Sequence, residues 1–319
     1  MIEISFRTET LSSEQKHTLT DFIHSKLSEL SKVLDLSTLE RIIISQNFTE
    51  DVLQMQKQYR MRETGHTERP DGIAVAKVLD TGIEEHLKQT IVVNDYLMAW
   101  LFLEEYRQYS FHMLHHELCH VHDNYYKHKM FSLEARAGKG LNKHEHVLVY
   151  NADPVWGEYV AVRLSSSSFA ISDTIELPTN NLYMTYLIDL IISSKTIAVD
   201  AIASYRYEGD ISKLYNKVQE ETSMLFKIAA TTQGYIDGLG LSSNDKIVDL
   251  INDNIMETYF YDTWLKQWQA LQSLFSVYPN RNDVYQLLEL GNSLLGCWNA
   301  LGIYPRYLEQ ADSIYVDVP

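Results

Sequence analysis

A short run of the sequence has residue types and a spacing that suit a metal ion. His116 and His120 are four positions apart, and Glu117 lies between them. Residues four apart share one face of a helix, so both imidazoles can reach one ion, and zinc accepts nitrogen ligands at about 2.0–2.1 Å. Glu117 is one position round the helix, where it can take a proton from metal-bound water without being a ligand. The run therefore predicts one zinc ion with Glu117 as the catalytic general base.

A catalytic zinc ion takes three protein ligands and keeps one position open for water. Glu158, on a second predicted helix, is the preferred third ligand. Hydrolases with a third histidine need glycine and histidine at positions that here hold Asp123 and Tyr126, which excludes that class. Asp123 is itself a weaker candidate ligand. We prefer it as a partner of the ligands or as an ion-pair acceptor for Arg163.

A peptidase also needs a donor for the oxyanion that develops at the scissile carbonyl. The candidates near the predicted ligands are Tyr159, Arg163, His144 and His146. The two histidines lie on a predicted loop between the ligand helices, from which they could swing over the metal. Tyr159 directly follows Glu158 on a helix and so points elsewhere. The sequence leaves this choice open.

Histidines are crowded around the motif, since eight of the twelve lie between His112 and His146. Of the eight, only His116 and His120 are expected to bind the metal, since they frame the motif that contains Glu117. We expect four others to be packing or surface residues. These are His112, His115, His122 and His128.

The two ligand segments resemble a known family. The string HELCHVHD, with Glu158 on a following helix in WGEYVAVRLSS, resembles the gluzincin branch of zinc metallopeptidases. Both strings are also similar to those of uncharacterised bacterial and prophage-associated zincin-like proteins, over residues 90–165. The resemblance implies that His116, His120 and Glu158 bind zinc and that Glu117 acts as base and then as acid.

The same resemblance implies that the strand at residues 90–94 is an edge strand that aligns an extended substrate. The sequence departs from the family at Val162, where an acid would follow Glu158 by four positions. This departure leaves open which residue orients the ligand histidines.

The elements that must position these residues indicate an α+β fold. Residues 1–178 are expected to form a zincin-like metallopeptidase domain, with a small mixed sheet and a long active-site helix without Pro or Gly over 96–124.

Ser12 and Gln15 predict a capping box for a helix to about residue 34. Asp153 and Pro154 predict the start of the second ligand helix, which ends at Ser165, after a loop over 132–151. Alternating and apolar runs predict strands at 2–6, 39–48, 72–79 and 90–94.

Residues 179–319 are expected to form an all-helical domain of unknown role. Apolar residues recur there at intervals of three and four, and Gly238, Gly240 and Pro279 interrupt the pattern. The expected helices lie near 180–206, 211–236, 245–277 with one break, and 282–300.

Composition excludes some partners. Lys and Arg number 27 against 43 Asp and Glu, giving a net charge of −16 that repels phosphate backbones, so we expect no nucleic acid. The longest apolar stretch, 182–199, is interrupted by Asp189 and Lys195 and is not expected to cross a membrane. The start of the chain lacks the pattern of a secretory signal, and two cysteines make no disulfide framework, which predicts a cytoplasmic protein.

Three functions fit these residues. The leading hypothesis is a zinc-dependent endopeptidase that acts on a protein or peptide, which the acidic second half suggests is basic. The second is a non-enzymatic zinc-binding interaction protein, although a structural site takes four ligands and has no need of Glu117. The third is a metal-dependent hydrolase of a non-peptide substrate. The sequence leaves the oligomeric state open.

Overall fold

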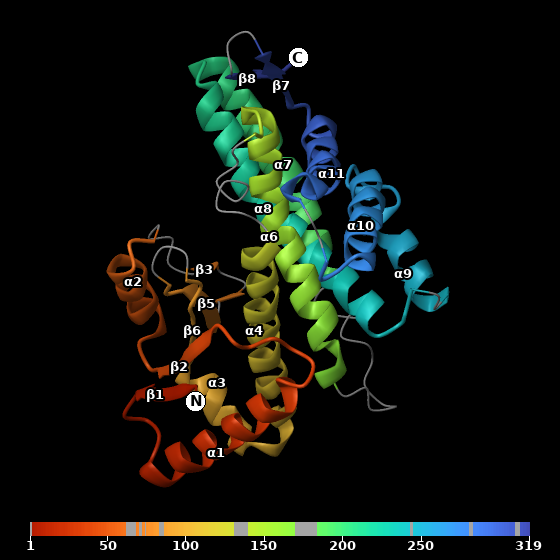
Figure 1. The fold of residues 1–319 in the computed structure, drawn as a ribbon. Helices are drawn as coiled ribbons and strands as arrows, with labels where there is room; N and C mark the ends of the chain where they lie inside the picture. The colour runs from red at the N-terminus through yellow and green to blue at the C-terminus, as the bar shows by residue number, and fades with distance from the viewer. Residues whose placement is uncertain are drawn as a thin grey trace. The chain divides into compact units, whose positions relative to one another are not determined.

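A computed structural model describes most of the chain (Figure 1). The described residues are 2–61, 68–69, 72–73, 75–82, 86–130, 140–169, 184–242, 245–280, 283–309 and 313–319. They are α+β, with many helices and a small mixed sheet. The chain divides into two compact units, residues 1–129 with 164–170 and residues 130–163 with 171–319. The predicted domain boundary at 178 lies outside the described residues.

The first unit is built on a four-stranded sheet in the order β1-β2-β6-β5. Its strands are β1 (Glu3–Arg7), β2 (Leu39–Ser45), β5 (Ala76–Asp80) and β6 (Gln89–Asn94). The first two pairs in this order are parallel, and β5 is antiparallel to β6. β2 and β6 carry continuous runs of fully buried Ile and Val, as strands covered on both faces do.

This topology corrects two expectations. The strand at 90–94 is not an edge strand, because β6 pairs with β2 on one side and β5 on the other. The outer strand on that side is β5. The expected strand at 72–79 is divided between β5 and a short hairpin of β3 (Glu68–Arg69) and β4 (Gly72–Ile73). Which strand is outermost depends on pairing between distant segments, which no local pattern records.

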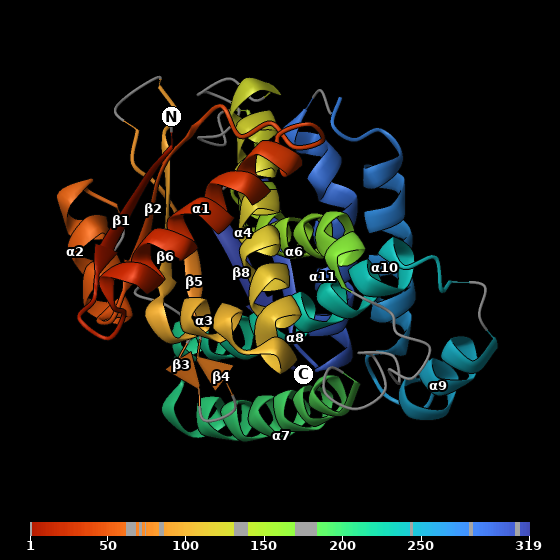
Figure 2. The ribbon, with the colours of Figure 1, turned by 90° about the horizontal axis from the view of Figure 1, so that it is seen from below.

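Helices cover both faces of this sheet. The capping box of Ser12 and Gln15 is confirmed at the start of α1 (Ser13–Leu30). α2 (Phe48–Gln58) begins where the second strand was expected to continue, and its Val52 and Met55 pack on Ile43 and Val92 of the sheet. Figures 1 and 2 show α2 on one side of the sheet and α1 with α4 (Glu104–Met130) on the other.

The single helix expected over 96–124 is broken near its start. α3 (Asp95–Ala99) continues into a 3-10 turn, η1 (Trp100–Phe102), and the extended backbone of Leu103 separates this turn from α4. Past this break, α4 buries a stripe of apolar residues, Leu114, Leu118 and Val121, against the unit's core. The predicted histidine pair therefore lies well inside one long helix.

In the second unit, α6 (Lys143–Ser165) begins earlier than expected. Residues 143–151 are helical and not loop, because Asn142 and Glu145 form a reciprocal capping box, with bonds of 3.0 and 2.8 Å. Pro154 consequently lies inside the helix and not at its first position. Two tight contacts fix α6 in this unit. A Cβ on Gly234 would lie 2.9 Å from the Tyr159 carbonyl oxygen, and one on Gly291 would lie 2.7 Å from the Leu148 Cβ.

The rest of the second unit is largely helical, as predicted. Its helices are α7 (Met184–Glu208), α8 (Ile211–Gly238), α9 (Asp245–Ile255), α10 (Tyr261–Ser276), η4 (Val284–Gln286) and α11 (Leu287–Ala300). The expected break within 245–277 is confirmed between α9 and α10. The expectation of an all-helical region is wrong at the end of the chain, where β7 (Tyr304–Leu308) and β8 (Ser313–Asp317) form an antiparallel hairpin.

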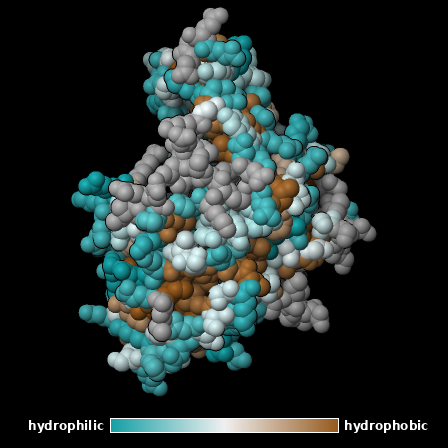
Figure 3. Space-filling model, viewed as in Figure 1, coloured by the Kyte–Doolittle hydropathy of each residue, from teal (hydrophilic) through white to brown (hydrophobic). Residues whose placement is uncertain are grey.

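The described surface is mixed in polarity. In the face shown in Figure 3, apolar residues gather near the centre of the lower half, and hydrophilic residues surround them. Among the described helices, none combines the length and hydropathy needed to cross a bilayer.

Burial of His112 makes stability depend on pH. Its Nδ1 lies 2.9 Å from the Ser168 hydroxyl, and burial, followed by the charges of His116 and His115, lowers its pKa from 6.5 to about 3. Between about pH 6.5 and about pH 3, His112 is protonated in the unfolded chain but neutral in the folded chain, so lowering the pH favours unfolding. From about pH 7 to about pH 5, His112 should lower the free energy of unfolding by about 2 kcal/mol. Urea denaturation of wild type and His112→Gln checks this, and an equal pH dependence in both proteins contradicts it.

Candidate metal centre

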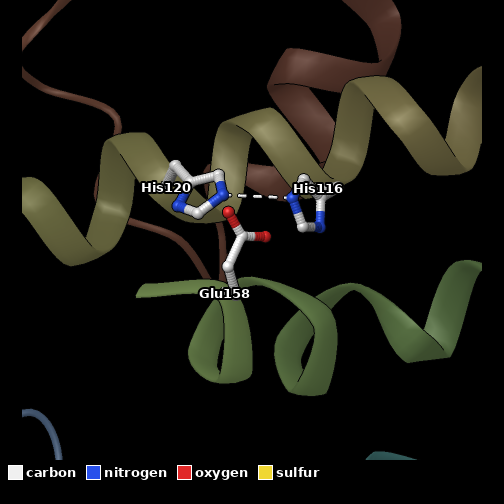
Figure 4. Close-up of side chains that lie close together, drawn as sticks. All are labelled: His116, His120 and Glu158. Atoms are coloured by element: carbon white, nitrogen blue, oxygen red, sulfur yellow. Dashed lines mark hydrogen bonds between the residues drawn. The ribbon is translucent and has the colours of Figure 1, made fainter. Parts of the chain in front are cut away.

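The structure brings together the three residues predicted to bind a metal. His116 and His120 project from α4 and Glu158 from α6, and one ligand atom from each lies within 4.8 Å of the others (Figure 4). The two Nε2 atoms are 3.0 Å apart. All three side chains are half-buried. Among the described residues, this is the one group of three or more His, Cys, Asp or Glu side chains that meets so closely.

The donor set fits a metal ion. Two nitrogens bound to a tetrahedral zinc ion lie about 3.3 Å apart, so the observed separation needs only a few tenths of an ångström of adjustment. Two imidazoles and a carboxylate are ligands that zinc accepts, and three ligands leave one position for water or substrate. The group can therefore hold a metal ion.

Contacts with the sheet fix α4 beside the histidine pair. The side chain of Gln89, the first residue of β6, is fully buried. Its Nε2 donates to the Val121 carbonyl at 3.0 Å, and its Oε1 accepts from Asn124 Nδ2 at 2.9 Å. Leu118 and Cys119, which lie between the two histidines, are completely buried. Burial raises the pKa of the Cys119 thiol well above its usual value, so it remains a protonated packing group.

Other histidines of α4 have packing roles, as predicted. His112, His115 and His122 are almost completely buried. Burial is the largest cause of their lowered pKa values, which reach about 3 for His112 and about 4 for His115. The Nδ1 atom of His122 accepts the backbone N–H of Asp35 at 2.6 Å. Neutral rings in these positions complete the core and do not belong to the metal-binding group.

Glu117 and Asp123 are both acids of α4 outside the metal-binding group. Glu117 is largely buried, and its helix position is about 100° round from His116. Asp123 is almost fully buried, with its Oδ2 3.1 Å from Lys127 Nζ. Of the two third-ligand candidates, the structure thus places Glu158 in the group.

His144 and His146 are not on a loop. Both belong to the first turn of α6, the same helix that carries Glu158. At 1.5 Å per residue, they lie about 18–21 Å from Glu158 along the helix axis. Because both histidines belong to a helix, the loop movement that was expected to bring them over the metal does not apply.

Tyr159 and Arg163 converge on an acid that sequence reasoning missed. Tyr159 is completely buried, and its hydroxyl donates to Asp237 Oδ2 at 2.5 Å. The Arg163 guanidinium donates to the Tyr159 hydroxyl and lies 3.5 Å from the same carboxylate oxygen. Burial, and then the bond to Asp237, raises the pKa of Tyr159. Asp237 sits near the end of a helix, and no motif marks it in the sequence.

Removing any one ligand should weaken metal binding. Wild type should hold about one zinc ion per chain by elemental analysis. Zinc affinity should fall by about a hundredfold or more in each of His116→Ala, His120→Ala and Glu158→Ala. Loss of a group that only orients a ligand lowers metal affinity by about ten- to a hundredfold, so the loss of a ligand should have a larger effect. His146→Ala, which removes an exposed imidazole from α6, is the matched control. Wild-type affinity in Glu158→Ala would show that the third ligand is another residue.

Comparison with protein-family models, curated proteins and solved structures gives no significant match. The resemblance to gluzincins therefore stays a prediction from the sequence strings. Any functional assignment depends on the group His116, His120 and Glu158 itself.

Proposed function

We propose that this protein is a zinc-dependent peptidase whose ion is held by His116, His120 and Glu158. The observation that carries the proposal is the composition of the group, two imidazoles and one carboxylate, with Glu117 beside a ligand. A structural zinc site is closed by four protein ligands, whereas a catalytic site keeps one position open. The three-residue group thus supports an enzyme over a non-enzymatic zinc-binding protein.

Each residue has a defined part in peptide hydrolysis. When bound, zinc polarises a carbonyl oxygen and lowers the pKa of a water molecule. Glu117 takes the proton from the attacking water and delivers it to the leaving amine. Glu117 follows His116 directly on α4 and is not a member of the ligand group, as the role of a general base requires.

The sheet supports a peptide as the substrate. β5 is one of the two outer strands of the four-stranded sheet, and it lies next to β6. An extended peptide can add to an outer strand through main-chain hydrogen bonds, which recognise a backbone whatever its sequence. The proposed endopeptidase would use β5, in place of the strand at 90–94, to align its substrate.

Aromatic side chains at the start of α4 suit the apolar side chains of such a peptide. The ring of Trp100 lies tilted against those of Tyr96, Tyr106 and Tyr109, with ring centroids 5.2–6.2 Å apart. The three tyrosines are 42–45% exposed. Tyr109 is two helical turns before His116, so it shares that face of α4, about 10 Å along the axis. Extended chain rises about 3.3 Å per residue, which places a substrate side chain there about three residues from the cleaved bond.

Glu117→Gln should separate metal binding from catalysis. The amide cannot take a proton, so hydrolysis of denatured casein or a peptide library should fall by about a hundredfold or more while zinc content is unchanged. Glu105→Gln, at a surface position of α4, should be active. Turnover retained by Glu117→Gln would exclude its role as base. Stoichiometric zinc in a wild type that cleaves no peptide would favour the non-enzymatic or non-peptide alternatives.

Tyr109→Ser should change substrate preference. Loss of the ring should raise KM for library peptides with Phe or Leu about three residues from the cleaved bond, by about tenfold for the loss of roughly 1.4 kcal/mol of apolar contact. Tyr207→Ser is the matched control, because Tyr207 is 93% exposed and lies on α7. Identical peptide preferences in Tyr109→Ser and wild type would remove the aromatic cluster from the substrate site.

A further inference from the structure

We propose that Asp237 of α8 is a positioning residue that sets the orientation of Glu158. The inference rests on the proposed zinc site and concerns how the second unit holds α6. Asp237 lies outside the metal-binding group, and its side chain is 4% exposed. A buried carboxylate is costly unless it is well compensated, and here it is compensated by side chains from two other helices.

Three helices meet at the Asp237 carboxylate. Its Oδ2 accepts the Tyr159 hydroxyl of α6 at 2.5 Å and Trp268 Nε1 of α10 at 3.0 Å. Its Oδ1 accepts Gln272 Nε2 of α10 at 2.9 Å. Arg163 of α6 adds its charge 3.5 Å from Oδ2 and lies 3.9 Å above the Phe275 ring. The two α6 residues held in this way are one turn apart and bracket the turn that follows Glu158.

Gly234 allows α6 and α8 to approach closely beside the Asp237 contacts. Gly234 precedes Asp237 by one turn, and a Cβ there would lie 3.2 Å from the Val162 side chain as well as 2.9 Å from the Tyr159 carbonyl oxygen. Val162 is the position where the gluzincin resemblance leads one to expect an acid. In this chain it packs against α8, and the polar contacts that fix α6 come from Asp237.

Holding Tyr159 and Arg163 fixes the rotation of α6 about its own axis. A side-chain atom about 5–6 Å from a helix axis moves by about 2 Å when the helix turns by about 20°. Metal–ligand distances tolerate only about 0.2 Å. Because Glu158 is adjacent to Tyr159 on a different face, a small rotation released at Asp237 would carry its carboxylate out of bonding range.

The test uses Co²⁺ in place of zinc, since the visible absorption of Co²⁺ responds to the number and geometry of its ligands. Asp237→Asn should lower zinc affinity by about ten- to a hundredfold, measured by chelator competition, and shift the cobalt spectrum towards that of Glu158→Ala. Asp51→Asn is the matched control. Asp51 is also a buried acid with two side-chain partners, Arg7 and Ser45, but it lies in the first unit. Its replacement should lower stability and leave the cobalt spectrum unchanged.

The outcomes separate this inference from the proposed function. A folded Asp237→Asn with wild-type zinc affinity and cobalt spectrum overturns the positioning role and leaves the zinc peptidase standing. If Asp237→Asn does not fold, Tyr159→Phe replaces it, because it removes only the hydroxyl; an unchanged spectrum again overturns the inference, and a shifted one supports it. A wild type that takes up neither zinc nor cobalt overturns both.

Discussion

The distance between two imidazole nitrogens is the constraint on which the proposed site depends. In a bound site, the distances between an ion and its ligand atoms vary by only a few tenths of an ångström. A helix supplies most of that accuracy, because side chains four apart lie one above the other on the same face. In α4 this places the Nε2 atoms of His116 and His120 3.0 Å apart. The rest of each unit must keep its ligand helix from turning or sliding.

The two ligand helices are fixed by different means. α4 is held by a buried apolar stripe and by Gln89, whose amide joins the first residue of β6 to the helix turn after His120. α6 is held within its own unit by close contacts at two glycines and by the carboxylate of Asp237. In both helices, a buried polar side chain from another element forms a hydrogen bond within one turn of a ligand: Gln89 at Val121 and Asp237 at Tyr159. A buried polar group that loses its hydrogen bonds destabilises the protein. Each helix is therefore most stable in the one orientation in which these hydrogen bonds form.

Local signals in the sequence predicted the parts of the site that a single helix determines. That His116 and His120 can reach one ion follows from helical periodicity alone. The start of α6 could also have been predicted, because Asn142 and Glu145 form a capping box. Asp153 and Pro154 are also typical of a helix start, and they led to the wrong position. Pro154 is accommodated inside the helix, where it forgoes one backbone hydrogen bond.

What the sequence could not predict depends on contacts between distant segments. The place of β6 inside the sheet follows from its pairing with both β2 and β5. The part played by Asp237 follows from its approach to Tyr159, Trp268 and Gln272, and nothing near it in the sequence announces this. The hairpin of β7 and β8 was missed although Ile314, Tyr315 and Val316 are residue types that favour strands.

X-ray absorption at the zinc edge of the zinc-loaded protein tests the central claim most directly, because it reports the atoms bound to the ion without reference to any substrate. The account predicts two imidazole nitrogens at about 2.0–2.1 Å, with oxygen from a carboxylate and from water completing the shell. A shell of four protein ligands, a shell that contains sulfur, or one unchanged by Glu158→Ala would contradict it.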